Sequence, residues 1–376
     1  MRARGVPLRL GYDYRAALHN REGIGRAQRL ALGALRRHLA TRGQPLELGL
    51  FAATLRAPSV PLPEREGPAG VERWCGWRLP ARWAWPLTRT TGGAAAWLGG
   101  LDLFLGLATQ PLWVGNAPSV AVLYDLLFLE GAGRFLGQAG AARMARAVER
   151  WLPQLARLQV PSRHVARAAA QHLGLPAERI DVVPLGGDGL LSSAELPMAL
   201  PPGRFVLTVG RIDPRKNLLA GLRAFERLAE RERDLHWLLV GPAGFGSGPI
   251  LAALSASRHS QRVRWLGALP DGALRFLYAR CSAFFFPSEA EGFGLPPLEA
   301  RYLGAPVAAS DRTALPEYLT DPGCRLADPH DDRALAQALA EALALTRAAL
   351  PAYCGPTWDG AAEAQWRSLE RALRET

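Results

Sequence analysis

Lys216 and Arg211 are the residues whose types and spacing first suggest chemistry in this chain. Lys216 is the one lysine among the 45 Lys and Arg residues of the 376-residue sequence. It lies in the string GRIDPRKN (210–217), after an apolar run at 205–209 that predicts a buried parallel strand. An ammonium is a compact charge that can reach a single phosphate oxygen, whereas a guanidinium is a planar fork. The pair therefore predicts a phosphate clamp in a strand-to-helix loop, with a solvated surface lysine as the alternative.

A second segment, 284–310, has the pattern of a strand, a glycine turn, a helix and a further strand. Pro296 and Pro297 suit the first turn of the helix, where their missing N–H groups cost nothing. We expect this helix to end near Gly304. Glycines let backbone N–H groups approach a ligand closely, and the N-terminus of a helix favours negative charge. The segment thus predicts a site for an anionic or polar ligand.

Two carboxylates of this segment, Glu291 and Glu299, could take part in that chemistry. Glu291 lies in the loop and Glu299 about one turn into the expected helix. Such carboxylates can accept hydrogen bonds from sugar hydroxyls, or they can act as general acid and base. They can also be solvated charges at a helix start. The spacing by itself leaves these interpretations open.

The order of the motifs resembles that of a known family. Five strings between residues 204 and 339 are similar to the C-terminal half of family 4 glycosyltransferases, which are retaining enzymes of GT-B fold with nucleotide-sugar donors, some of them mannosyltransferases. These strings are GRIDPRKN, LLVGPAGFGSG, RVRWLGALPDGALRFLYARCSAFFFPSEAEGFGLPPLEA, GAPVAASDRTALPEYLTD and LADPHDDRALAQAL. Shorter likenesses at 23–26, 122–130 and 173–188 extend the resemblance over nearly the whole chain.

Length and pattern agree with an α/β fold. Apolar strands alternate with helical patterns, which indicates parallel sheets, and 376 residues suffice for two cores. The resemblance implies the GT-B arrangement of two Rossmann-like domains that face each other across a cleft. The expected parts are an acceptor-binding domain at 1–185, a linker at 186–203, a nucleotide-sugar-binding domain at 204–352, and a C-terminal helix at 353–376 that crosses back to the first domain.

The resemblance also implies roles for the motif residues. Arg211 and Lys216 would form the clamp for the diphosphate, with Lys216 exposed in the cleft. Glu299 would hold the ribose hydroxyls, and Glu291 would lie beside the donor sugar. We expect the other donor contacts at Gly210, Gly292, Phe293, Gly294, Leu295, Gly23 and Gly25. The loop at 241–246 would line the same cleft.

The only small molecule that these motifs imply is the donor itself. No resident cofactor is expected, because the nucleotide diphosphate sugar is a co-substrate. The sequence has no Asp-x-Asp pair of the metal-binding kind. The clamp cations could neutralise the leaving diphosphate without a metal ion. We therefore predict no metal site.

The first half of the chain departs from the family pattern at Tyr124, where relatives often have a histidine that approaches the donor sugar. Tyr124 could hydrogen-bond a sugar hydroxyl but could not act as a base near neutral pH. Asp125 and Arg26 are candidates for positioning the acceptor or sugar. A structural role for Asp125, and a helix-capping turn around Arg26, are the alternatives.

The net positive charge comes entirely from the first half of the sequence. Residues 1–190 carry 24 Arg against 13 acidic residues, and residues 191–376 carry 21 basic against 21 acidic residues. Trp and Arg side chains concentrate between 72 and 97, which is typical of a contact with an anionic membrane surface. The expected contact residues are Trp74, Trp77, Arg78, Arg82, Trp83 and Trp85. A packing segment, and a platform for single-stranded nucleic acid, are the alternatives.

The leading hypothesis is a retaining glycosyltransferase that moves a hexosyl unit, mannosyl in some related members, to a glycan or lipid-linked acceptor in cell-surface polysaccharide synthesis. The N-terminus lacks the apolar segment of a signal peptide, so we expect a cytoplasmic protein at the inner face of the membrane. A GT-B scaffold that binds without catalysis and a basic nucleic-acid-binding protein are the competing hypotheses. The base, sugar, linkage and acceptor stay open.

Overall fold

The computed structural model describes residues 6–19, 23–52, 73–75, 81–131, 133–190 and 200–375. The chain divides into two compact units. Unit 1 comprises the described parts of Met1–Leu126, Ala142–Leu185 and Trp358–Thr376, and unit 2 comprises those of Leu127–Ala141 and Gly186–Thr357. Half of the expected linker, 191–199, lies outside the described residues.

Unit 1 is built on a parallel sheet of seven strands in the order β3-β2-β1-β4-β5-β6-β7. Four of the five residues of β1 that follow Leu8 are buried, because helices cover both faces and leave no solvated side. The strands are β1 (Leu8–Asp13), β2 (Leu46–Phe51), β3 (Arg73–Cys75), β4 (Leu103–Leu107), β5 (Ser119–Val122), β6 (Leu155–Val160) and β7 (Ile180–Val182).

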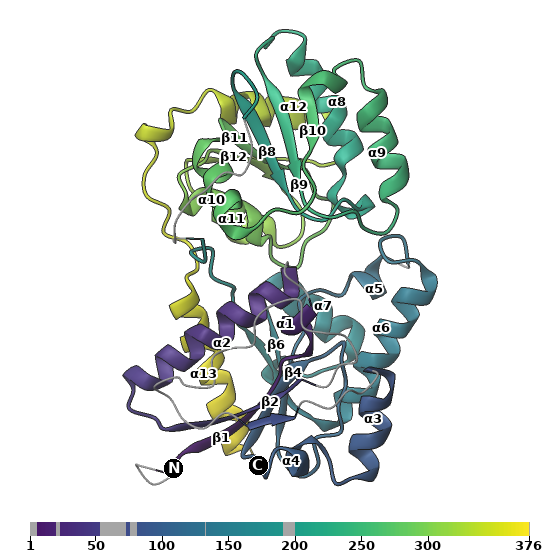
Figure 1. The fold of residues 1–376 in the computed structure, drawn as a ribbon, viewed down its shortest axis with the longest axis vertical. Helices are drawn as coiled ribbons and strands as arrows, with labels where there is room; N and C mark the ends of the chain where they lie inside the picture. Colours follow the sequence, from purple (N-terminus) through teal and green to yellow (C-terminus); the bar gives the residue numbers. More distant parts are fainter. Residues whose placement is uncertain are drawn as a thin grey trace. The chain divides into compact units, whose positions relative to one another are not determined.

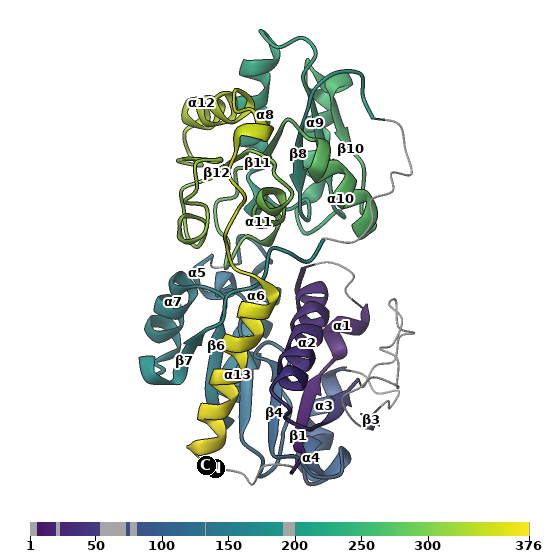
Figure 2. The ribbon, with the colours of Figure 1, turned by 90° about the vertical axis from the view of Figure 1, so that its left-hand side faces the viewer.

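Helices α2 and α13 lie side by side on one face of this sheet (Figure 2). Leu35 of α2 and Leu369 of α13 share one core cluster with the strands. Helix α6 packs on the opposite face, where Trp151 lies against Phe104. The helices that connect these strands and end the chain are α1 (Arg15–His19), α2 (Gly23–Thr41), α3 (Ala81–Thr90), α4 (Ala94–Trp97), α6 (Gln138–Trp151), α7 (Arg163–Leu173) and α13 (Trp358–Arg374), with 3-10 turns η1 (Leu152–Gln154) and η2 (Ala177–Arg179).

The last helix, α13, is joined to unit 1 by polar contacts as well as by its apolar face. Asp181 of β7 accepts hydrogen bonds from Arg157 of β6 at 2.5 Å, from Ser368 at 2.6 Å and from Arg371 at 2.8 Å. Arg157 also donates to Glu375 at 2.6 Å. These long-range contacts attach the C-terminal segment to strands that lie some 200 residues earlier in the sequence.

Residues Leu127–Ala141 group with unit 2, although the sequence suggested that all of 1–185 forms one domain. This segment contains α5 (Leu127–Glu130) and the start of α6. Arg134 forms an ion pair with Glu289 at 2.8 Å, and the ring of Phe245 lies close to Gly137. Such side-chain contacts could not be read from a sequence pattern.

Unit 2 contains a parallel sheet of six strands in the order β10-β9-β8-β11-β12-β13. The predicted strand at 205–209 and the two strands expected within 284–310 are confirmed. The strands are β8 (Phe205–Val209), β9 (His236–Val240), β10 (Val263–Trp265), β11 (Ala283–Phe286), β12 (Val307–Ser310) and β13 (Cys324–Ala327).

Helices cover both faces of the second sheet, with α8, α9 and α12 on one face and α10 and α11 on the other (Figure 1). Phe225 of α8 and Trp237 of β9 belong to the core cluster between the first of these layers and the sheet, with ring centres 5.7 Å apart. The helices are α8 (Leu218–Ala229), α9 (Ser247–Ala256), α10 (Asp271–Arg280), α11 (Leu295–Tyr302) and α12 (Asp332–Leu343), with 3-10 turns η3 (Pro214–Lys216), η4 (Ser260–Arg262), η5 (Leu315–Glu317) and η6 (Arg347–Ala349). The predicted α/β architecture with two parallel sheets is therefore confirmed.

No helix in the described part of the chain is both long enough and apolar enough to cross a membrane.

Candidate functional site

The candidate site lies at the carboxyl ends of β8 and β11, which are neighbours in the second sheet. The chain leaves β8 toward α8 on one face, and it reaches β11 from α10 on the other face. In open parallel sheets such a change of direction leaves a crevice in which ligands bind. The loops at 210–217 and 287–294, both predicted from the sequence to carry the chemistry, meet at this point.

Lys216 is at the centre of the site. Its Nζ donates a hydrogen bond to Oε1 of Glu291 at 2.7 Å and lies 4.4 Å from the centre of the Phe286 ring. Lys216 is 5% exposed and Glu291 is 7% exposed. The prediction that Lys216 is exposed was therefore wrong, because the carboxylate and the aromatic ring enclose its ammonium.

Gly210 makes the buried position of Lys216 possible. A Cβ atom at Gly210 would lie 2.9 Å from Cε of Lys216, and the backbone at this glycine has a φ of 153°. A side chain at position 210 would therefore displace the lysine stem. The glycine of the GRIDPRKN motif is therefore needed for packing against the lysine, and it is not merely a turn residue.

Arg215 is a member of the site that the sequence did not indicate. Its NH1 donates to Oε2 of Glu291 at 2.8 Å, and its Nε lies 4.0 Å from Oδ1 of Asp213. One carboxylate of Glu291 therefore bridges the ammonium of Lys216 and the guanidinium of Arg215. The signal for Arg215 was its position beside Lys216 in the motif, but adjacent residues in a loop need not point the same way.

Charges decide the protonation states in this cluster. Burial would raise the pKa of the Glu291 carboxyl, but Arg215 and Lys216 outweigh burial and hold the pKa below its usual range. Burial lowers the pKa of the Lys216 ammonium, and Glu291 opposes this effect. Glu291 is consequently an ionised group that accepts hydrogen bonds, which makes it unsuitable as a general acid near neutral pH.

Arg211 begins the same loop but points to solvent. Its residue is exposed, and in the described part of the chain its guanidinium makes no hydrogen bond. Its stem lies over Gly244, where a Cβ atom would come within 2.6 Å of Cγ of Arg211. The loop at 241–246 thus packs directly against the loop that carries the cations, and Arg211 presents an unsatisfied positive charge beside the buried pair.

Helix α11 begins in the second loop and follows the predicted pattern. Gly294 is its N-cap with a φ of 95°, Leu295 is its first residue, and a Cβ atom at Gly294 would lie 2.3 Å from Leu315. Phe293 packs against Tyr318 with ring centres 4.6 Å apart, and Gly292 is buried between Glu291 and Phe293. The N–H groups at the start of this helix favour negative charge.

Glu299 lies in the second turn of α11 and is 3% exposed. Its Oε2 accepts a hydrogen bond from the hydroxyl of Tyr278 in α10 at 3.3 Å. The sequence did not indicate this tyrosine, which is 21 residues earlier in the chain. The carboxylate therefore has a protein donor, and any role toward a ligand would use its other acceptor positions.

The remaining candidates lie in unit 1. Residues 23–26 form the first turn of α2, which Gly23 starts with a φ of 48°, and Gly25 is buried. Arg26 is 8% exposed. The structure thus shows the helix start that was the alternative interpretation of this motif. Whether Gly23, Gly25 and Arg26 contact a ligand stays a prediction.

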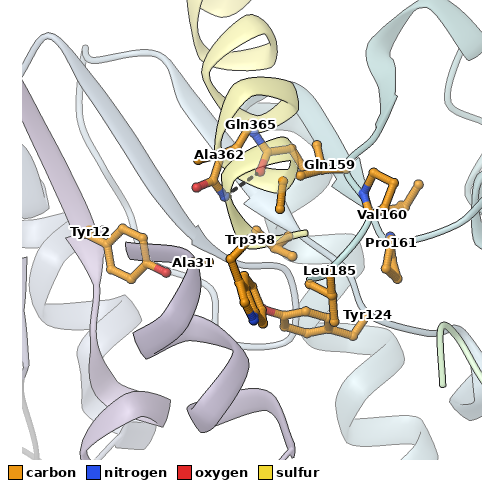
Figure 3. A pocket seen from close by; sticks show the side chains of 14 residues that line it. Tyr12, Ala31, Tyr124, Gln159, Val160, Pro161, Leu185, Trp358, Ala362 and Gln365 are labelled. Carbon is orange, nitrogen blue, oxygen red and sulfur yellow. Dashed lines mark hydrogen bonds between the residues drawn. The ribbon is translucent and has the colours of Figure 1, made fainter. Parts of the chain in front are cut away.

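Tyr124 follows β5 and lines a cavity of about 20 Å³ in unit 1, beside Trp358 of α13 (Figure 3). A cavity of this size has room for about one water molecule, so it does not hold a sugar. The amide of Gln365 donates to Gln159 at 3.1 Å across its wall. Burial raises the pKa of the Tyr124 hydroxyl, which keeps it protonated and excludes a role as a base near neutral pH. Asp125, the next residue, is partly buried.

Part of the predicted membrane contact can be located. Trp83 in α3 is 49% exposed, whereas Trp85 packs edge-on against Trp113 and receives Arg150 over its ring at 5.6 Å. Trp77 and Arg78 lie outside the described residues, as do the side chains of Trp74 and Arg82. In the described ranges no group of His, Cys, Asp or Glu side chains has the arrangement of a metal site.

Comparisons with known proteins agree with this geometry. Residues 200–355 match the family model of the glycosyl transferases group 1. The chain is 36% identical to O-antigen chain mannosyltransferase B of Escherichia coli over 140 residues, which cover 37% of this chain and 36% of that protein. The chain spans about a third of the length of the first curated relatives that it matches.

Solved structures resemble the whole chain. Sucrose-phosphate synthase from Thermosynechococcus elongatus superposes with a TM-score of 0.70 at 18% identity, over 98% of this chain and 97% of that one. The Anabaena protein HepE, solved in complex with UDP-glucose, superposes with a TM-score of 0.62 at 19% identity, over 98% and 96% of the two chains. These likenesses confirm the predicted GT-B fold.

Proposed function

We propose that this chain, which matches the model of the group 1 glycosyltransferases over residues 200–355 and has the GT-B fold, transfers a hexosyl unit from a nucleotide diphosphate sugar to a glycan or lipid-linked acceptor. The mannosyltransferase named among its relatives makes a mannosyl donor the first to test. The reaction would belong to the synthesis of a cell-surface polysaccharide and would retain the anomeric configuration.

The observation that carries this proposal is the cation cluster at the end of β8. Lys216 and Arg215 share the carboxylate of Glu291, and Arg211 lies exposed at the start of the same loop. These three cations lie near two carboxylates, those of Glu291 and Asp213, so the cluster has an excess of positive charge. An excess of positive charge beside the N-terminus of a helix favours a dianionic ligand such as a diphosphate.

In the proposed mechanism these groups stabilise the departing nucleoside diphosphate. Arg211 and Lys216 would donate to its oxygens, and the N–H groups of Phe293, Gly294 and Leu295 would add their partial charges. Glu291, being ionised, would accept hydrogen bonds from the hydroxyls of the donor sugar, and Glu299 would hold the ribose. The acceptor hydroxyl would attack from the face that the diphosphate leaves, and a phosphate oxygen would take its proton. No metal ion would be required, because the cations carry out the neutralisation.

Transfer assays with purified full chain and a panel of UDP-, GDP- and ADP-sugars test the proposal directly. We expect release of one nucleoside diphosphate only when its sugar donor and an acceptor are both present, at a rate that EDTA leaves unchanged. Binding of nucleotide without transfer would instead indicate a scaffold that has lost catalysis. A rate abolished by EDTA and restored by a divalent cation would overturn metal independence.

As part of the proposed function, the chain would bind an anionic membrane surface, where a lipid-linked acceptor would lie. The positive charge of residues 1–190 and the exposed indole of Trp83 support it, because aromatic rings and cations bind together at lipid headgroups. We expect the chain to sediment with vesicles that contain phosphatidylglycerol and to stay in solution with phosphatidylcholine alone.

A pair of tryptophan variants separates this contact from general adhesion. Trp83→Ala should weaken sedimentation about threefold to tenfold, in keeping with the loss of one aromatic anchor. Trp265→Ala removes an indole of similar exposure from unit 2, at 42%, and should leave sedimentation unchanged. Equal effects of the two substitutions would exclude α3 as the membrane-facing element.

A further inference from the structure

Two residues other than glycine have a positive φ in the described part of the chain, namely Asn217 at 52° and Thr313 at 56°. Asparagine adopts this left-handed conformation fairly often, whereas a β-branched residue such as threonine rarely does. Backbone strain of this kind persists only where the surroundings impose it, and it is enriched at functional sites. Thr313 is therefore the more informative of the two.

Both residues adjoin the Lys216–Glu291 pair. Asn217 directly follows Lys216, and its amide donates to the carbonyl oxygens of Pro287 at 3.1 Å and Pro329 at 2.8 Å. Thr313 lies 22 residues after Glu291, and its Oγ1 accepts a hydrogen bond from the backbone N–H of Glu291 at 2.9 Å. The two left-handed residues thus support the two partners of one ion pair.

The hydrogen bonds of Thr313 are specific to a hydroxyl group. Oγ1 accepts from the N–H of Glu291 and donates to the carbonyl oxygen of Arg312 at 2.8 Å. In addition, the N–H of Ala314 donates to the carbonyl oxygen of Glu291 at 3.4 Å. A hydroxyl can do both because it is donor and acceptor at once, which neither a methyl group nor a carboxylate at this position could do.

We propose that Thr313 is a positioning residue for the transfer reaction, which holds the backbone of Glu291 so that its carboxylate meets Lys216 and Arg215. The left-handed backbone turns the hydroxyl toward the loop at 287–294, and the buried side chains of Ala314 and Leu315 hold the backbone there. Leu315 in turn lies against Gly294, the N-cap of α11. The consequence for transfer depends on the proposed function, but the hydrogen bond and its strain do not.

Three substitutions of Thr313 separate the contribution of its hydroxyl group from that of its backbone strain. Thr313→Ser keeps the hydroxyl, Thr313→Ala removes it and keeps a side chain in a left-handed backbone, and Thr313→Gly removes both the hydroxyl and the strain. We expect Thr313→Ser to retain kcat/KM within about twofold. Both other variants should lose about tenfold in kcat/KM, which corresponds to one hydrogen bond. Thr313→Gly should nevertheless unfold at the same or a higher denaturant concentration than the wild type.

These outcomes distinguish positioning from a merely structural role. If Thr313 only contributed to stability, activity would follow stability, and Thr313→Gly would remain as active as the wild type. That result would overturn the proposal. Loss of activity in Thr313→Ser would overturn it as well, because the hydrogen bond is preserved there.

Hydrogen exchange of the Glu291 amide gives a readout that needs no substrate. We expect this amide to exchange about tenfold faster in Thr313→Ala and Thr313→Gly than in the wild type and in Thr313→Ser, measured by mass spectrometry with residue resolution. Equal exchange in all four proteins would reject the positioning role even if activity changed. If the wild type transferred no sugar from any donor, the proposed function would fail, and the exchange rates would still decide whether Thr313 holds Glu291.

Discussion

Each unit of this protein contains a buried cluster of charged side chains, and the two clusters differ in how their hydrogen-bond donors are used. In unit 1 the guanidinium of Arg157 donates to Asp181, to Glu375 and to the carbonyl oxygen of Glu178. In unit 2 the ammonium of Lys216 has three N–H groups, and within the described structure one of them donates a hydrogen bond, to Glu291. Four of the five N–H groups of Arg157 are therefore paired, against one of the three of Lys216, so the first cluster is close to saturated with internal partners and the second is not.

The number of unpaired donors distinguishes a charged cluster that stabilises the fold from one that can bind a ligand. A buried cation with nearly all its donors paired mainly holds together the elements that carry it, as Arg157 links Glu375, just after α13, to β6 and β7. A buried cation with free donors, beside an exposed Arg211 and a helix N-terminus, is ready for an anion that the chain does not itself supply. Burial alone would not have distinguished the two clusters, since Arg157 is 3% exposed and Lys216 is 5% exposed.

The largest expected effect comes from breaking the nearly saturated cluster. Arg157→Ala leaves Asp181 buried with fewer donors, and removal of one partner of a buried ion pair typically costs about 3 to 5 kcal/mol. The free energy of unfolding from urea titration should fall by that amount. Arg367→Ala provides the control, because its ion pair with Glu363 lies on the exposed side of α13 and contributes about 0.5 kcal/mol or less. Equal losses of unfolding free energy in the two variants would mean that the unit 1 cluster does not stabilise the packing of α13.

The sequence allowed prediction of much of unit 2 because its site comes from short, local motifs. The loops at 210–217 and 287–294 each follow a buried strand, so the neighbouring carboxyl ends of β8 and β11 bring Lys216 and Glu291 together. The α/β architecture followed from strands that alternate with helical patterns. Helix α11 followed from two prolines and a glycine N-cap, whose backbone requirements are local.

The rest depended on contacts between residues far apart in the sequence. The Arg157 cluster joins residues 157, 181, 368 and 371, and no spacing rule connects such positions. Thr313 and Tyr278 act on Glu291 and Glu299 from 22 and 21 residues away. The exposure of Lys216 was predicted wrongly for the same reason, since the ring of Phe286 belongs to β11 and the carboxylate of Glu291 to the loop that follows it, some 70 residues after Lys216 in the sequence.

A substitution of Lys216 should have the next largest effect, and it tests the unsaturated cluster. If its free donors stabilise the departing diphosphate, Lys216→Ala should lower turnover about 10² to 10³-fold, as loss of one such donor does in other enzymes. Because Lys216 is buried, the free energy of unfolding should also fall, by about 1 to 3 kcal/mol. Steady-state kinetics with the preferred donor and urea titration measure the two losses.

The matched control for Lys216 is Arg227→Ala, which removes a cation from α8 in the same unit but away from the carboxyl ends of the strands. It should change turnover less than about twofold, as surface substitutions usually do. Wild-type turnover in Lys216→Ala would show that the buried ammonium has a structural role like that of Arg157, and the contrast between the two clusters would then be lost.

The smallest expected effect is a loss of stability at low pH. In both clusters burial would raise the pKa of the carboxyl, of Glu291 and of Asp181 alike, and in both the neighbouring donors outweigh burial and lower it. A lowered pKa in the folded state contributes stability that is present above the pKa of the unfolded chain, and that is lost as the pH falls through the folded pKa. The free energy of unfolding of the wild type should therefore decline below about pH 4, by about 1.4 kcal/mol for each unit of pKa difference.

Glu291→Gln sharpens this comparison because it removes the titrating group and leaves Lys216 and Arg215 facing each other without a negative charge. We expect this variant to be less stable than the wild type at pH 7, to lose less stability as the pH falls from 5 to 3, and so to approach the stability of the wild type in acid.

A nucleoside diphosphate should reduce the difference in stability between Glu291→Gln and the wild type at pH 7. It supplies the negative charge that Glu291 no longer provides, and a bound ligand stabilises the folded state. Asp181→Asn should show the same approach in acid, but the nucleotide should not reduce its difference from the wild type, since the proposed diphosphate site is at Lys216 and not at Asp181. Rescue of both variants, or of neither, would mean that unused donors do not mark the ligand site.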